Sequence, residues 1–213
     1  MPPNPQPPDD FAERLAAPTP TPGGGAAAAR VGLIATSLLR MVTSITLSKS
    51  EAKPPDDPPL LDEVRQVGDG ATLLGERFRG LEAADARAFD SYLEALRLPK
   101  ESTAERQRRD AARRRTALEA TDVPLEMLEA AVETVDLARR LADVGSRMRL
   151  GAESDVGGAV ELAHGAFRAA ELTVQVNLPA LGEEDRRRVE ARHEALRERL
   201  RQAYEAFSGR PEE

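Results

Sequence analysis

Apolar side chains recur three or four residues apart over much of this 213-residue sequence, and this spacing constrains the fold more than any other feature. The clearest run lies within residues 155–176 and comprises Val156, Val160, Ala163, Phe167, Ala170 and Val174. Such spacing places one apolar face on an α-helix, whereas a half-buried strand needs strict alternation. Aromatic residues make up only 3% of the chain, and we find no alternating runs rich in Val, Ile, Thr, Tyr or Phe. The sequence therefore predicts an all-α fold.

Prolines, glycines and capping residues divide the chain into a bundle of about six to eight helices, mostly antiparallel because their connections are short. Three helix ends carry specific signals: Ser102 or Thr103 with Glu105 or Gln107 in reach for a capping box, Gly145 as a C-cap, and Ser154 as an N-cap. The expected helices span Phe11–Ala16, Ala26–Ser48, Leu60–Arg79, Leu81–Leu96, Ser102–Thr121, Val123–Val144, Asp155–Val176 and Glu183–Phe207.

The expected organisation is one helical domain over residues 9–207, between a disordered Pro-rich segment (1–8) and a short tail (208–213). The four prolines of Glu51–Pro59 predict a loop inside this domain. The largely small and apolar stretch Ala26–Leu47 contains Arg30 and Arg40, and each arginine would cost about 2.5–3.5 kcal/mol at the centre of a membrane. We therefore expect a buried helix there and, with no signal peptide visible, a cytoplasmic protein.

The charge and the metal-binding residue types argue against several functions. The formal net charge is −7, whereas a generic nucleic-acid binder is more often basic. There is no cysteine, and the two histidines, His164 and His193, are far apart in the sequence, so we expect no metal site. The cluster Arg108–Arg115 is either a solvated helix face or a patch that steers an anionic ligand, and it is the only support for a nucleic-acid-binding module.

A series of short motifs resembles a known family. They stand in this order: Phe11–Leu15 (FAERL), Thr19–Gly25 (TPTPGGG), Asp85–Asp90 (DARAFD), Leu98–Lys100 (LPK), Ala120–Leu125 (ATDVPL), Ser154-Asp155 and Val176–Leu178 (VNL). Together they resemble the C-terminal domain of formiminotransferase-cyclodeaminase and its stand-alone relatives, the methenyltetrahydrofolate cyclohydrolases. The resemblance covers about residues 9–185.

The resemblance implies an all-helical homodimer that acts on the one-carbon bridge of tetrahydrofolate, with the folate as substrate and no cofactor. A cyclohydrolase adds water to 5,10-methenyltetrahydrofolate and gives 10-formyltetrahydrofolate, and a cyclodeaminase closes the formimino group and releases ammonia. Because this chain has no formiminotransferase half, we favour the cyclohydrolase. Departures from the family pattern at Ala84, Ser146 and Thr173 leave open an inactive helical interaction protein of the same fold.

Three residues are candidates for the catalysis, because hydrolysis of the bridge needs a base for the water and an acid for the departing nitrogen. Asp155 is the first, as base and counter-charge to the cation; its alternative role is to cap a helix. Asp85 is the second, and since Asp90 points some 140° away on the same helix, only one of this pair is expected to face a site. Lys100 either donates a proton, binds the glutamate tail of folate, or is solvated.

Six further residues are candidates for substrate binding: Thr21, Gly23, Gly24, Gly25, Ser154 and Asn177. The glycines precede a helix whose free N–H groups attract anions, or they form a tight turn. Asn177 either reads the pterin edge or bonds a neighbouring helix. The hypothesis requires Gly24 and Asp155 to meet at one cleft, within one chain or between two copies.

Overall fold

A computed structural model describes residues 10–52, 58–148 and 150–208 and consists of helices, with no strand among these residues. The predicted all-α class is confirmed. The elements are α1 (Phe11–Ala16), α2 (Gly24–Ala52), α3 (Pro58–Arg97), α4 (Thr103–Met148), α5 (Glu153–Asn177), the short 3₁₀ helix η1 (Leu178–Ala180) and α6 (Glu183–Ser208). The predicted segment 1–8 lies outside the described residues, as does most of the predicted loop between α2 and α3. Of the predicted tail 208–213, Ser208 is the last residue of α6 and residues 209–213 lie outside the described residues.

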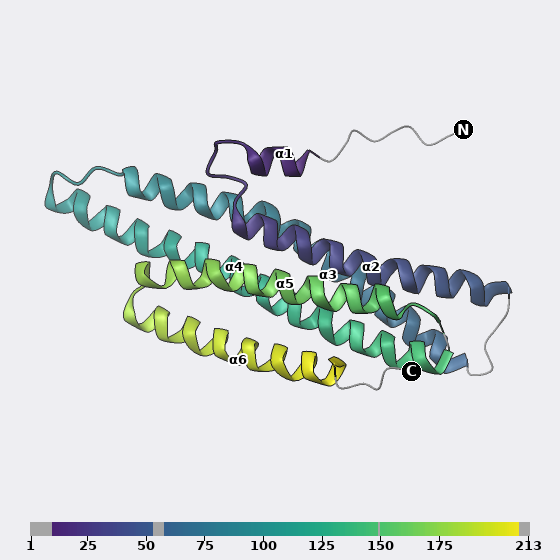
Figure 1. Cartoon of the computed structure of the whole chain (residues 1–213). Coiled ribbons are helices and arrows are strands. Elements are labelled where there is room, and N and C mark those ends of the chain that lie inside the picture. The colour runs from purple at the N-terminus through teal and green to yellow at the C-terminus, as the bar shows by residue number, and fades with distance from the viewer. Residues whose placement is uncertain (1–9, 53–57, 149, 209–213) are drawn as a thin grey trace.

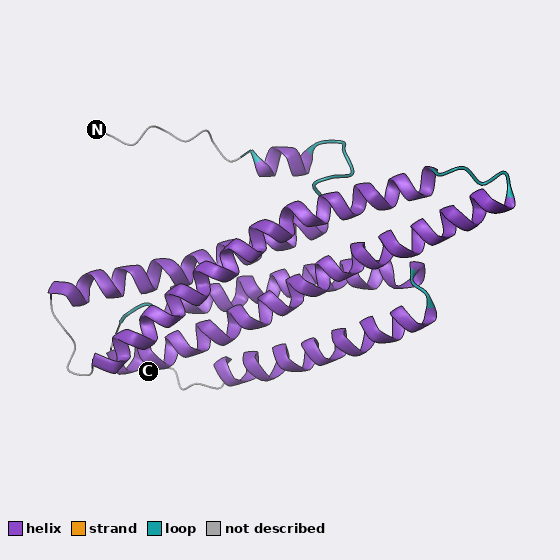
Figure 2. Cartoon of the chain, turned by 180° about the vertical axis from the view of Figure 1, so that it is seen from behind, coloured by secondary structure: helices purple, strands orange, loops and turns teal. Residues whose placement is uncertain are grey.

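The four long helices α2–α5 form an antiparallel bundle in which successive helices run in opposite directions (Figure 1). Helix α6 packs mainly on α4, and α1 lies beside the start of α2 (Figures 1 and 2). The end of α3 and the beginning of α4 extend as a helical hairpin beyond the other helices (Figure 2). The core contains fully buried side chains from each long helix, including Leu39, Phe78, Leu128 and Phe167.

Two predicted helix breaks are wrong. The segments Leu60–Arg79 and Leu81–Leu96 form the single helix α3, and Ser102–Thr121 and Val123–Val144 form the single helix α4. The helix continues through Gly80, where an added Cβ would meet nothing within 4 Å, and the earlier glycines of α3 each lie against a side chain of another helix. A Cβ on Gly75 would lie 3.3 Å from Oγ1 of Thr36, and a Cβ on Gly68 would lie 3.0 Å from Oγ1 of Thr43.

The same close packing recurs in the opposite direction at the start of α2, where the glycines belong to α2 and the larger side chains to α3. A Cβ on Gly32 would lie only 2.4 Å from the ring of Phe78. The glycines of both helices therefore allow the two helix axes to approach closely, and they fix the register of α2 along α3.

Pro124 lies inside α4 and is accommodated by a side chain from α5. Proline has no N–H, so the carbonyl four residues earlier, that of Ala120, loses its helical donor. The Asn177 side chain supplies a replacement, since its Nδ2 donates to the oxygen of Ala120 over 2.8 Å. The helix therefore passes through Pro124 without ending.

Of the three predicted helix-end signals, one is confirmed and two are wrong. The Ser102–Glu105 capping box is confirmed: the Ser102 N–H donates to the Glu105 carboxylate, and the Glu105 N–H donates to the Ser102 hydroxyl. The prediction that Gly145 ends α4 is wrong, because the helix continues to Met148 and the left-handed residue is Gly151, with φ 64°. Ser154 is not the N-cap of α5, which is Ala152.

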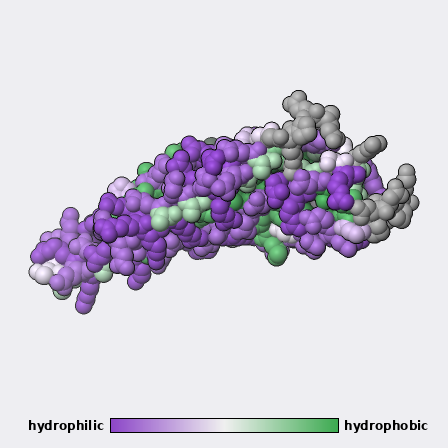
Figure 3. All heavy atoms as spheres, turned by 90° about the horizontal axis from the view of Figure 1, so that it is seen from below, coloured by the Kyte–Doolittle hydropathy of each residue, from purple (hydrophilic) through white to green (hydrophobic). Residues whose placement is uncertain are grey.

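Helix α2 is long and apolar enough, by length and composition alone, to cross a membrane, but only 39% of its most apolar window is buried inside the structure. It contributes Ala28, Ala35 and Leu39 to the core and packs against α3, α5 and α4. It is therefore a helix of the bundle, as predicted, with an outer face that is unusually apolar. By contrast, the face on which α6 lies is largely hydrophilic, with small hydrophobic patches scattered over it (Figure 3).

Candidate active site

The start of α2 meets the middle of α3 at one carboxylate. Gly25 is buried against Asp85, and a Cβ at position 25 would lie 2.1 Å from Oδ1 of Asp85, so only glycine fits there. The backbone N–H of Ala26 donates a hydrogen bond to the same carboxylate. Asp85 thus occupies the place of an anion at the N-terminus of α2, although it belongs to a different helix. The structure brings together the glycine motif and one of the two predicted aspartates.

Asp85 is half-buried, and this burial raises the pKa of its carboxyl above the usual value, while the hydrogen bond from Ala26 opposes the shift. A carboxyl group with a raised pKa holds a proton more readily than an exposed one, which suits a group that must both take up and give back a proton. Asp90, one and a half turns later, is exposed. Of the two aspartates on this helix, Asp85 is therefore the one that faces the start of α2.

The loop before α2 is ordered by short contacts of its own. The hydroxyl of Thr19 donates to the carbonyl of Thr21 over 3.0 Å, and the N–H of Ala27 donates to the carbonyl of Gly23 over 3.0 Å. The peptide bond between Thr21 and Pro22 is cis. Thr21, Gly23 and Gly24 immediately precede Gly25, the glycine that contacts Asp85, and Gly24 is exposed.

The sequence analysis missed a second group beside Asp85. Arg30 of α2 forms a two-pronged ion pair with Glu82 of α3, with Nε–Oε2 and Nη2–Oε1 both at 2.8 Å. The guanidinium carbon of Arg30 lies 4.4 Å from the centre of the Phe11 ring, and Phe11 is the only buried residue of α1. The sequence signal for this ion pair was an arginine within an otherwise apolar stretch, because a partly buried cation needs an acidic or polar partner.

Ser154 and Asp155 lie far from Gly24 within one chain. They belong to the first turn of α5, where Ser154 is exposed. One turn later, Gly158 packs on Leu38. Leu38 follows Gly24 by fourteen residues, about 20 Å along the helix axis. Since α5 runs antiparallel to α2, Asp155 lies even further away (Figure 1). The expected meeting of Gly24 and Asp155 does not occur within one chain.

The other two candidates are also not brought to Asp85 by direct contact. Lys100 is exposed in the connection between α3 and α4, about 20 Å beyond Asp85 along α3. Asn177 lies nearer, because the antiparallel register of α3 and α4 places its partner Ala120 at about the level of Asp85. Its amide nitrogen is already engaged by Ala120, which is the neighbouring-helix role left open for it.

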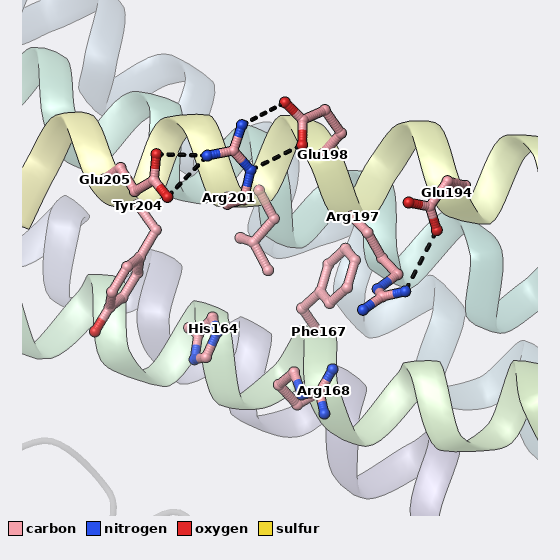
Figure 4. A pocket seen from close by; sticks show the side chains of 10 residues that line it. His164, Phe167, Arg168, Glu194, Arg197, Glu198, Arg201, Tyr204 and Glu205 are labelled. Atoms are coloured by element: carbon pink, nitrogen blue, oxygen red, sulfur yellow. Dashed lines mark hydrogen bonds and ion pairs between the residues drawn. The ribbon is translucent and has the colours of Figure 1, made fainter.

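A groove lies between α5 and α6, and its charges compensate one another (Figure 4). Arg201 lies between Glu198 and Glu205, Arg197 pairs with Glu194, and the groove offers three arginines against three glutamates. Such a groove has no net charge with which to attract an anionic ligand. We therefore place the candidate site at Asp85 and not in this groove.

Metal ligands and the arginine cluster point to no second site. Among the described residues, no group of three or more His, Asp or Glu side chains is arranged to hold a metal ion. His193 contacts the buried Glu171, with Nε2 and Oε1 2.9 Å apart. Within Arg108–Arg115, Arg109 donates to the carbonyl of Leu96, and Arg113 and Arg115 pair with acidic residues of their own helix.

This chain is similar to several known proteins. It is 35% identical over 195 residues to a methenyltetrahydrofolate cyclohydrolase of Methylorubrum extorquens, covering 92% of this chain and 89% of that protein. It is 29% identical over 168 residues to the formimidoyltransferase-cyclodeaminase of Mus musculus, but spans only 30% of that longer protein. Its fold matches the crystal structure of formiminotetrahydrofolate cyclodeaminase from Thermotoga maritima, with a TM-score of 0.80, 22% identity and coverage of 93% and 92% of the two chains.

The family itself follows from a match that covers nearly the whole chain. Residues 7–205 match the formiminotransferase-cyclodeaminase family, a span that includes the glycine motif, Asp85 and the α5–α6 region. The protein therefore belongs to the formiminotransferase-cyclodeaminase family.

Proposed function

We propose that this protein is a folate one-carbon enzyme that hydrolyses 5,10-methenyltetrahydrofolate to 10-formyltetrahydrofolate. The relative from Methylorubrum extorquens, which this chain matches over most of both lengths, carries the name of that activity. The observation within the structure that supports the chemistry is Asp85, a half-buried carboxyl with a raised pKa at the glycine-rich start of α2. The substrate offers the matching partner, a cationic carbon between two nitrogens.

Asp85 is proposed to act as base and then as acid. It takes a proton from the attacking water as the oxygen bonds to the bridge carbon. Its proton then passes to the departing N5, the C–N5 bond breaks, and the hydroxyl proton leaves to solvent as the formyl group forms on N10. The net reaction consumes one water and releases one proton. The carboxylate also opposes the positive charge of the substrate, and the chemistry needs no metal and no cofactor.

The direct test is the loss of the near-ultraviolet absorbance of the methenyl substrate. We expect Asp85→Asn to fold normally and to lose at least about 100-fold in kcat, a typical contribution of general acid–base catalysis. The matched control is Asp90→Asn, which removes an exposed carboxylate from the same helix. Equal turnover by the two variants would remove Asp85 from the mechanism.

Asp155 requires a second copy of the chain to take part, because one chain holds it too far from Gly24. We propose a homodimer that covers the outer face of α2, where Ile34, Met41 and Ile45 are exposed at helical spacing. If Asp155 of one subunit serves the Asp85 site of the other, Asp85→Asn and Asp155→Asn each abolish turnover. Hybrids of the two variants then regain activity, since one of their two sites is intact. A monomer in sedimentation, or hybrids without activity, would refute this arrangement.

Two alternatives give different results in the same assays. A formimidoyltetrahydrofolate cyclodeaminase, the activity in the names of the mammalian relatives, releases ammonia from the formimidoyl substrate. An inactive interaction protein of the same fold gains no thermal stability from tetrahydrofolate derivatives, whereas a binder is stabilised in proportion to RT ln(1 + [L]/Kd). We also propose a cytoplasmic location, where folate substrates are available; a fusion to a fluorescent reporter tests it.

A further inference from the structure

A three-residue clasp joins three helices next to the candidate site. It consists of Phe11 in α1, Arg30 in α2 and Glu82 in α3. Arg30 uses two nitrogens on the two oxygens of Glu82 and presents its flat face to the Phe11 ring. Both charged side chains are largely shielded, with exposed fractions of 24% and 19%. Nη2 donates a charge-assisted hydrogen bond to Oε1, and Nε lies within ion-pair distance of Oε2. Stacking on an aromatic ring suits arginine better than lysine.

The clasp lies close to the Asp85 site along both helices. Glu82 precedes Asp85 by three residues, so the two carboxylates lie on the same face of α3 one turn apart. Arg30 follows Gly25 by five residues on α2. Two neighbouring contacts therefore join α2 to α3: the contact between Gly25 and Asp85, and the ion pair between Arg30 and Glu82.

The aromatic part of the clasp acts on the loop that leads to the site. Among the described residues of α1, Phe11 alone is buried, and residues 17–23 run from α1 to the start of α2. This loop contains Thr21 and Gly23 and leads directly into Gly25, which contacts Asp85. Its far end is therefore fastened to the helix pair by the Phe11 ring, and its near end by the Ala27–Gly23 backbone hydrogen bond.

We propose that Arg30, clamped by Glu82 and covered by Phe11, is a positioning residue that holds α1 and the 17–23 loop over the Asp85 site and so sets the affinity for substrate. This role rests on the proposed function. Asp85 stands on the rigid α3, so loosening the loop weakens binding while the proton transfers in the bound state continue. Loss of this clasp is expected to raise KM and to leave kcat nearly unchanged.

The experiment compares variants of the clasp with a matched ion pair elsewhere. Phe11→Ala and Arg30→Met open the clasp, Arg30→Lys keeps the charge without the planar fork, and Phe11→Tyr keeps the ring. The control is Arg140→Met, because Arg140 pairs with Glu63 over 2.7 Å between α3 and α4, near the opposite end of α3. The readouts are kcat and KM with the methenyl substrate, the thermal midpoint, and amide hydrogen exchange of peptides covering residues 17–28.

We expect Phe11→Ala and Arg30→Met to raise KM about tenfold with kcat within about twofold of the original, and Arg30→Lys to fall between. Exchange over residues 17–28 rises in both clasp variants. Arg140→Met lowers the thermal midpoint and leaves KM and this exchange unchanged, and Phe11→Tyr behaves as the original protein. A purely structural role instead lowers the active fraction, and hence kcat, at constant KM; that result would overturn the proposal.

The exchange measurement separates this inference from the proposed function. If the protein turns over no folate substrate, the proposed function fails, and the substrate-affinity role fails with it. Faster exchange confined to residues 17–28 in Phe11→Ala then still supports the clasp as a fastener of the loop. Exchange in Phe11→Ala equal to that of the original protein would refute the clasp whatever the activity, and this variant leaves no charge unpaired.

Discussion

Replacing Gly25 by alanine tests the contact between the glycine motif and Asp85 directly. An added Cβ would lie 2.1 Å from Oδ1 and 2.5 Å from Cγ of Asp85, whereas ordinary contacts begin near 3.4 Å. The carboxyl group must therefore retreat by more than 1 Å, or α2 must move away from α3. Either movement stretches the hydrogen bond from the Ala26 N–H to Asp85.

The cost of this change combines opposing contributions. Overpacking costs about 1–3 kcal/mol. Alanine in place of a helical glycine returns about 0.4–1 kcal/mol by restricting the unfolded chain. We expect a net loss of about 1–2 kcal/mol, which lowers the thermal midpoint by about 2–8 °C for a chain of this size. Turnover should fall about 100-fold, because a displacement of about 1 Å in a catalytic group has an effect of that order.

Two other glycines of α2 provide controls for the alanine variant. A Cβ on Gly24 meets nothing within 4 Å, so Gly24→Ala should retain turnover and gain a little stability. A Cβ on Gly32 meets the Phe78 ring at 2.4 Å, so Gly32→Ala should lose stability while its folded fraction keeps its turnover per molecule. The measurements are thermal unfolding and methenyltetrahydrofolate hydrolysis. If Gly25→Ala and Gly24→Ala hydrolyse the substrate equally fast, the assignment of Asp85 to the site is wrong.

Three other predictions follow from individual side chains. Burial raises the pKa of Asp85, so the native state binds the proton more tightly than the unfolded state does. The unfolding free energy of the wild type should therefore fall as the pH rises from the pKa of Asp85 in the unfolded state through its pKa in the folded state. Urea titrations should show this fall relative to Asp85→Asn, and parallel pH curves of the two proteins would contradict it. Glu171 is buried and contacts His193, Arg168 and Arg197. The variant Glu171→Gln should therefore lower the unfolding free energy by about 2 kcal/mol. The exposed Glu198, whose pKa Arg201 lowers to about 2, is the control, and Glu198→Gln should cause no measurable loss of stability. Asn177→Leu leaves the part-buried carbonyl of Ala120 without this donor and should cost at most about 1–3 kcal/mol, the penalty for a fully buried group. The cost should be smaller in a Pro124→Ala background, and equal costs in both backgrounds would refute the link.

Some ends of the helices were predictable, because prolines and caps act on their own neighbours, although the caps expected at Gly145 and Ser154 do not form. Helix α1 has the predicted bounds, Glu183 begins the last helix as expected, and the Ser102–Glu105 capping box forms. The middle of α3 was not predictable in this way. Its glycines lower helix propensity locally, but they are kept because Thr36 and Thr43 of α2 fill the space that their missing side chains leave. That information lies in a distant segment.

The candidate site at Asp85 was likewise predictable in its local features and not in its long-range contacts. Sequence reasoning selected Gly25 and Asp85 separately, from a glycine motif and a family resemblance, but sixty residues separate them and only the helix crossing brings them into contact. It preferred Asp155, because an acidic residue at the beginning of a regular helix is conspicuous in a sequence. Distance along the bundle cannot be read from such local signals, so the same reasoning placed Asp155 and Gly24 together.

Pro124 and Asn177 show why a pattern can be correct in each part and still mislead. A proline favours a helix boundary, and a polar amide in an apolar helix favours a binding role; each inference is sound for its own segment. In the structure these two residues compensate each other, because the Asn177 amide donates to the Ala120 carbonyl, which receives no N–H from Pro124. One hydrogen bond thus joins two predicted helices into α4 and fastens α5 to it at about the level of Asp85. A residue that breaks a local rule is therefore best examined together with other exceptions, because its partner breaks a local rule as well.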